Sequence, residues 1–188
     1  MPAPVEGRYL AYAATTSDQN FEVKGRSLGL AALLGSEEEA KAFVGGPLLL
    51  ARLSPMDYHR FHYPDEGMTL KQVTISGKLN SVSPFAFQQK PKIYLENERR
   101  VSILETKHFG RLAYIEVGAL CVGKIVQTHD PRLPFSRGEE KGYFQFGGST
   151  VIVLGQPGTW VPDPDLLSQT DIGRETLVRL GSQVGRVE

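Results

Sequence analysis

The stretch that decides the fold reads GYFQFGGSTVIVL, from Gly142 to Leu154. Aromatic and β-branched residues flank a Gly-Gly-Ser-Thr core on both sides, a pattern typical of two β-strands joined by a tight turn. Two glycines allow backbone conformations that other residues avoid, and they remove side chains that would block the carbonyl of Gly148. We therefore predict a turn that presents the hydroxyl of Ser149 beside an accessible peptide bond, although an ordinary hairpin turn fits the same residues.

The composition fits one globular domain, or two small lobes that share a core. The chain has 188 residues and a formal net charge of zero, which is enough for a substantial core and argues against a nucleic-acid partner. The single cysteine, Cys121, lies among apolar residues, so we expect it in the core rather than as a nucleophile. No apolar run approaches the roughly 18 to 20 residues that span a membrane. We therefore expect a chain that is soluble by itself or lies on a membrane without crossing it.

Strand patterns dominate the rest of the chain. The apolar run LLLARL over residues 48–53 predicts a strand buried on both faces. Alternating apolar and polar residues predict further strands over residues 68–77, 92–103 and 111–126. Short helices are predicted over residues 27–35 and after Ser36, which forms a capping box with Glu39. The prediction is a mainly β fold, an antiparallel β-sandwich or half-barrel with a few short helices near the N-terminus.

Two of the four histidines follow the predicted strand 48–53 and are candidates for catalysis. A serine hydroxyl is inert until a base removes its proton, and that base is usually a histidine, here His59 or His62. The other two, His108 and His129, lie beside polar turns and are predicted to be solvated. Histidines three residues apart can also bind metal or sit in the core on backbone hydrogen bonds, but no cluster of Cys, Asp or Glu completes a metal site.

Several motifs, in this order, resemble the phosphatidylserine decarboxylase proenzyme family. They are RLSPMDYHRFHYP at 52–64, LNSVSP at 79–84, NERR at 97–100, VGA at 117–119 with VG at 122–123, and FGGST at 146–150. The resemblance implies a single catalytic domain over residues 1–188. It also implies a pyruvoyl-dependent carboxy-lyase, which converts phosphatidylserine to phosphatidylethanolamine through a Schiff base.

In that family the proenzyme cuts itself, here between Gly148 and Ser149. The resemblance therefore implies a larger fragment of residues 1–148 and a smaller fragment of residues 149–188. The first residue of the smaller fragment would become the cofactor, a pyruvoyl group derived from Ser149 that acts as an electron sink, and no metal would be needed.

The resemblance also implies roles for individual residues. His62 would be the base that deprotonates Ser149, and His59 would bind substrate or supply the proton that ends decarboxylation. The family commonly has an aspartate where this chain has Glu6, and the additional methylene predicts slow or absent maturation. The alternatives are a pyruvoyl-dependent decarboxylase of a soluble amino acid and a family member that does not process itself.

Phosphatidylserine lies in a bilayer, so the resemblance implies peripheral association with a membrane from the cytoplasmic side, and also a homodimer. Near the histidines we expect an apolar lip that contacts the substrate and the membrane, with core packing as the alternative. The candidates for this lip are Phe61, Tyr63, Pro84, Phe85 and Phe87.

Overall fold

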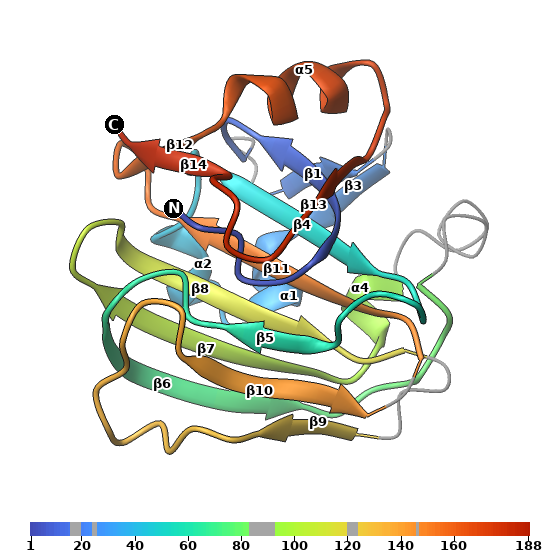
Figure 1. Cartoon of the computed structure of the whole chain (residues 1–188), viewed down its shortest axis with the longest axis vertical. Coiled ribbons are helices and arrows are strands. Elements are labelled where there is room, and N and C mark those ends of the chain that lie inside the picture. Colours follow the sequence, from blue (N-terminus) through green and yellow to red (C-terminus); the bar gives the residue numbers. More distant parts are fainter. Residues whose placement is uncertain (16–19, 24–25, 83–92, 120–123, 146) are drawn as a thin grey trace.

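The structure is a computed structural model that describes residues 1–15, 20–23, 26–82, 93–119, 124–145 and 147–188. Its described part consists mainly of antiparallel strands, with short helices on the outside (Figure 1). The predicted mainly β fold is therefore confirmed. None of the helices in this part has the length and apolar character needed to cross a bilayer.

A seven-stranded antiparallel sheet forms the centre of the molecule. In spatial order its strands are β13 (Thr176–Val178), β1 (Gly7–Tyr12), β4 (Leu48–Leu53), β11 (Ser149–Gly155), β8 (Gly110–Val117), β7 (Arg99–Thr106) and β6 (Gly67–Ile75). The apolar runs of β4 and β11 are buried almost throughout, because both strands have a neighbour on each side and side chains packed on both faces. The buried strand predicted over residues 48–53 is confirmed.

A three-stranded sheet packs in front of the central sheet (Figure 1). Its strands in spatial order are β5 (Arg60–His62), β10 (Glu140–Gln145) and β9 (Lys124–Gln127). The Phe61 ring lies between the sheets, with its centroid 5.0 Å from that of Phe144 and 6.4 Å from that of Tyr114 on β8. This aromatic contact joins the sheets into a sandwich.

The hairpin predicted around the glycine pair is wrong. Strand β10 pairs with β5 and β9, whereas β11 pairs with β4 and β8. All seven residues of β11 are buried, so this strand requires a central position in the larger sheet that a hairpin partner of β10 cannot have. The chain therefore crosses from one sheet to the other between Gln145 and Ser149.

The remaining elements lie at the edges. They are β2 (Asn20–Val23) with β3 (Arg26–Gly29), β12 (Trp160–Pro162) with β14 (Gly185–Val187), and the helices α1 (Leu30–Leu34), α2 (Glu37–Lys41), α4 (Ile93–Glu96) and α5 (Pro164–Asp171). The predicted cap of α2 is confirmed, because the Ser36 hydroxyl accepts a hydrogen bond from the Glu39 amide at 3.2 Å. Restricting helices to the N-terminal part is wrong, since α4 and α5 occur later in the chain.

A buried ion pair joins the two sheets. Lys141 Nζ on β10 donates to Glu116 Oε1 on β8 at 2.6 Å and to Gln127 Oε1 at 2.7 Å, and the side chains of Lys141 and Glu116 are fully buried. Desolvation lowers the pKa of Lys141 and raises the pKa of Glu116, while their attraction opposes both shifts. Each charge is tolerated inside the sandwich because the other is present.

Replacing one partner of this pair should destabilise the protein more than replacing both. Lys141→Met leaves the Glu116 carboxylate buried without a cation, which is expected to cost about 3–5 kcal/mol of unfolding free energy. Lys141→Met combined with Glu116→Leu should recover most of that loss. Urea denaturation followed by circular dichroism measures both values, and equal losses for the single and double variants would contradict the prediction.

Candidate active site

The crossing between the sheets depends on the first glycine of the pair. Gly147 has a φ of 86°, in the left-handed region where an L side chain is strained. At Gly148 an added Cβ would lie 3.4 Å from the carbonyl oxygen of Leu53 and 3.7 Å from Val82 Cγ2, which is ordinary contact. The backbone conformation therefore favours glycine at position 147. At position 148 a side chain would meet only ordinary contacts, so the backbone there is accessible because no neighbouring atom lies too close.

Ser149 is the first residue of β11, where it lies opposite Leu53 of β4. The residue is fully buried, and its hydroxyl has no hydrogen-bond partner in the described part of the chain. The prediction that a turn presents this hydroxyl is therefore wrong, because the strand begins at the serine itself. A buried hydroxyl without a partner costs about 1–3 kcal/mol, and such costs are typical of functional sites.

His59 lies next to the crossing. Its Nε2 is 2.5 Å from the carbonyl oxygen of Gly147, and its Nδ1 is 2.6 Å from the carbonyl oxygen of Asp57. Both oxygens can only accept hydrogen bonds, and a neutral imidazole has one N–H, whereas a doubly protonated ring donates to both. The surroundings of His59 therefore favour a proton donor rather than a base.

The loop after β4 holds His59 in this position. The Asp57 carboxylate accepts a hydrogen bond from the Ser54 amide at 2.6 Å, and the Asp57 amide donates to the Ser54 carbonyl at 3.0 Å. Arg8 Nη1 on β1 lies 3.6 Å from the same carboxylate. Sequence reasoning did not single out Asp57, although a serine followed three residues later by an aspartate is a usual signal for such a closed turn.

His62, on β5, has one occupied and one free ring nitrogen. Nδ1 is 3.0 Å from the carbonyl oxygen of Gly138, which can only accept, so Nδ1 carries the proton and Nε2 keeps its lone pair. Nε2 is buried and has no hydrogen-bond partner in the described residues. This is the protonation pattern of a general base. No hydrogen bond joins His62 to Ser149. His62 lies opposite Glu140 in the β5–β10 ladder, whereas the His59 carbonyl accepts a hydrogen bond from the Phe144 amide near the end of β10, so the structure brings His59, and not His62, to the crossing.

Glu6 precedes β1 and is partly buried. The adjoining backbone contacts β5, because the His62 amide donates to the Pro4 carbonyl at 2.9 Å. Among the described residues, however, the Glu6 carboxylate makes no hydrogen bond or ion pair. The Gly138 carbonyl occupies the nitrogen of His62 that an orienting carboxylate would hold.

The predicted apolar lip is wrong for two of its members. The exposed fractions of Phe61 and Tyr63 are 0% and 2%, because both rings point into the sandwich. The Tyr63 ring stacks on that of Phe135 with centroids 3.8 Å apart. Pro84, Phe85 and Phe87 lie outside the described residues, as does Cys121.

The other histidines lie apart from the crossing. The side chain of His129 is only 7% exposed, and its Nδ1 lies 3.2 Å from the Tyr63 hydroxyl, so the prediction that it is solvated is wrong. The side chain of His108 is 42% exposed and pairs with the buried Asp65 at 2.9 Å. Within the described ranges, no three residues of the types His, Cys, Asp and Glu gather to hold a metal ion.

A cavity of about 330 Å³ opens beside the crossing. It is lined by Pro55, His59, Tyr143, Phe144, Gln145 and Gly147. Its walls come from the loop after β4, from the end of β10 and from Gly147 of the crossing, and they include both partners of the His59–Gly147 contact. The cavity can accept a small polar group next to the imidazole of His59.

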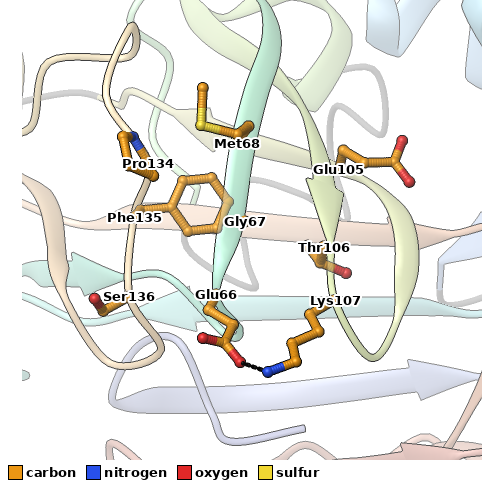
Figure 2. A pocket seen from close by; sticks show the side chains of 9 residues that line it. All are labelled: Glu66, Gly67, Met68, Glu105, Thr106, Lys107, Pro134, Phe135 and Ser136. Atoms are coloured by element: carbon orange, nitrogen blue, oxygen red, sulfur yellow. Dashed lines mark hydrogen bonds and ion pairs between the residues drawn. The ribbon is translucent and has the colours of Figure 1, made fainter.

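A larger cavity of about 580 Å³ lies elsewhere (Figure 2). Its walls are the start of β6, the end of β7 and residues 134–136, with the Glu66–Lys107 ion pair at its edge. Strand β7 begins beside Val117, the partner of Thr150, and runs away from it toward Thr106. The larger cavity is therefore at the opposite end of the sheet from Ser149, and we assign the chemistry to the smaller one.

Comparison with known proteins gives one consistent result. The model of the phosphatidylserine decarboxylase family matches residues 1–186. Phosphatidylserine decarboxylase proenzymes of Clostridium novyi (strain NT) and Chlamydia pneumoniae are 43% and 44% identical to this chain over 183 residues, which is 97% of it. The proenzyme of Desulfitobacterium hafniense (strain Y51) is 43% identical over 180 residues. The chain spans 60–62% of the length of these relatives.

The two glycines of the crossing should differ in their tolerance of a side chain. In a Ser149→Ala background, which removes the hydroxyl, Gly147→Ala should cost about 1–2 kcal/mol of unfolding free energy because of its positive φ. Gly148→Ala should cost clearly less, because its Cβ would meet only ordinary contacts. Urea denaturation compares the two, and an equal or larger loss for Gly148→Ala would contradict this account of the crossing.

Proposed function

The chain belongs to the phosphatidylserine decarboxylase family, and from this premise we propose that it is a self-cleaving proenzyme whose mature form decarboxylates phosphatidylserine. The observation that carries the proposal is the buried hydroxyl of Ser149, which has no partner in the described residues and directly follows two glycines. A histidine and a cavity of about 330 Å³ adjoin the same peptide segment. A serine with only a structural role would be expected to have a hydrogen-bonded hydroxyl, and it would need neither a histidine nor a cavity beside it.

The proposed cleavage uses only atoms of the chain and water. The Ser149 hydroxyl attacks the carbonyl carbon of Gly148, its proton passes to a base, and the amide nitrogen leaves as the amine of Ser149, so that an ester replaces the amide. Loss of the Cα proton then expels the Gly148 carboxylate and leaves a dehydroalanine. Hydrolysis of the dehydroalanine releases ammonia and produces a pyruvoyl group. That carbonyl supplies the electron sink for decarboxylation of an amine-bearing substrate.

We assign the base to His62. Its Nδ1 proton is held by Gly138, so the lone pair of Nε2 is free to accept the Ser149 proton. Because no hydrogen bond joins the two side chains, the proposal requires β5 and the crossing to approach each other before cleavage. The Glu6 carboxylate would have to displace the Gly138 carbonyl to orient His62, and this is why we propose slow maturation.

His59 suits a second role. Its Nε2–H donates to the carbonyl of Gly147 in the uncut chain, so it holds a proton one residue away from the peptide bond that breaks. In the mature protein the same group faces the cavity, where it can bind the substrate carboxylate or return a proton to the carbon that loses carbon dioxide. Either role requires a donor rather than a base.

The proposed fragments would stay together. Residues 149–188 contain β11, which is hydrogen-bonded on both sides by β4 and β8 of the larger fragment. The cut falls in the crossing between the two sheets, so it breaks no ladder of strand hydrogen bonds. Cleavage can therefore release the new N-terminus beside the cavity without unfolding the sheet.

The size of the cavity keeps a soluble substrate as the second candidate. A volume of about 330 Å³ accommodates an amino acid as well as a lipid headgroup. The homodimer and the attachment to the cytoplasmic side of a membrane, both implied by the resemblance, remain predictions.

Self-cleavage should depend on the serine and on His62. Ser149→Ala should abolish it, and His62→Ala should slow it at least about 100-fold, the usual contribution of a general base. Glu6→Asp should speed it, and His108→Ala, at the other end of the sheet, is the matched control. Denaturing electrophoresis against time measures the rates. Full-speed cleavage in His62→Ala would exclude His62 as the base.

Decarboxylation should depend on His59 after cleavage is complete. His59→Gln keeps one donor and should still mature, but it should release carbon dioxide from phosphatidylserine micelles at least about 100-fold more slowly. Free serine serves as the competing substrate in the same assay. Faster turnover of free serine than of phosphatidylserine would favour the soluble-substrate alternative, and an unchanged rate in His59→Gln would remove His59 from the reaction.

A further inference from the structure

The loop between β4 and β5 exposes two apolar side chains, Met56 and Tyr58, which we call the tip. Met56 is 96% exposed and Tyr58 is 42% exposed, between the last residue of β4 and the first of β5. An isolated exposed apolar side chain is ordinary on a protein surface. The tip differs from such cases in three respects, which are its anchoring, its neighbours and its charges.

The tip is anchored. Asp57, between the two apolar residues, binds both the amide and the carbonyl of Ser54, and its own carbonyl contacts Nδ1 of His59. The Tyr58 ring stacks on that of His62 with centroids 6.0 Å apart. The turn that carries Met56 is therefore fixed, and little backbone entropy remains to be lost when this side chain contacts a partner.

The tip borders the candidate active site. Pro55, the neighbour of Met56, lines the smaller cavity together with His59. Whatever surface Met56 and Tyr58 contact is consequently brought to the mouth of that cavity. If a substrate remains anchored in this surface, only its polar end would enter the cavity.

One lysine beside the cavity wall has no ion-pair partner among the described residues. Lys124 on β9 is exposed, makes no ion pair with the described residues, and lies opposite Gln145, which lines the cavity. Arg8 and Arg60 are 40% and 47% exposed and are each matched by one less exposed carboxylate. The lysine thus leaves a positive charge that complements an anionic surface.

We propose that the tip, Met56 with Tyr58, is the element by which this chain contacts an anionic lipid bilayer. The two side chains enter the interface, Lys124 faces anionic headgroups, and the cavity with His59 opens onto the lipid surface. The proposal rests on the proposed function for the identity of the lipid. It replaces Phe61 and Tyr63, which are buried, as the residues that contact the membrane.

The test is co-sedimentation of the 188-residue chain with vesicles of phosphatidylcholine, with and without phosphatidylserine. Met56→Ser should reduce the bound fraction at least about threefold, and Met56→Trp should increase it. The single natural tryptophan, Trp160, is buried, so a blue shift of the emission added by Met56→Trp on vesicles would report insertion. Leu133→Ser, at a side chain that is 56% exposed and next to the larger cavity, is the control.

The possible outcomes distinguish failure of the proposed membrane contact from failure of the proposed enzymatic function. Equal binding of Met56→Ser and the parent chain, or an equal loss in Leu133→Ser, would overturn the proposal. Equal binding to vesicles with and without phosphatidylserine would overturn the assignment of an anionic surface. Self-cleavage of the parent chain and of the Met56 variants is measured in parallel. If the proposed function is wrong, the parent chain will not cleave itself, but its binding to vesicles will be unchanged. Dissociation of a dimer by Met56→Ser, seen by sedimentation velocity, would assign the tip to a second copy instead.

Discussion

The structure depends on the burial of β11 in the middle of the larger sheet. All seven of its residues are buried and both of its edges are hydrogen-bonded, so its first residue, Ser149, has little freedom. Strand β10 belongs to the other sheet, and the chain must pass between them within the few residues that end at this serine. The left-handed conformation of Gly147 makes that passage possible. The passage between the two sheets thus places the Gly148–Ser149 peptide bond, which has no side chain on its glycine, next to a hydroxyl that has no partner in the described residues.

The surroundings of this crossing combine rigidity with incomplete hydrogen bonding. The Lys141–Glu116 pair fixes β10 against β8, and the closed turn at Asp57 fixes His59 against the Gly147 carbonyl. Yet the Ser149 hydroxyl and Nε2 of His62 remain without partners in the described part of the chain. The rigid supports hold His59 at the crossing, and the two unsatisfied atoms are available for the proposed proton transfer once β5 and the crossing approach each other. This contrast supports the proposed function.

Local signals in the sequence were sufficient for part of this arrangement. The buried strand β4 and the cap of α2 follow from short patterns, and the motif around His59 and His62 indicated the family. The hairpin prediction was wrong because the pairing of β11 depends on β4 and β8, which lie far away in the sequence.

Local signals were also present for two features that the sequence predictions missed. Alternation along β5 puts Phe61 and Tyr63 on the face opposite His62, and Asp163 followed by Pro164 is a usual start for a helix such as α5. The buried pairing of Lys141 had no local signal, because its partner is on another sheet.

The central claim is that the residue at position 149 becomes a carbonyl group that reacts with an amine. The most direct measurement is the intact mass of the protein after borohydride reduction in the presence of phosphatidylserine. The account predicts two fragments, residues 1–148 unmodified and residues 149–188 increased by the mass of a reduced lipid adduct at the new N-terminus. A Glu6→Asp chain that stays uncut on prolonged incubation, or a cut chain whose smaller fragment still begins with serine and carries no adduct, would contradict it.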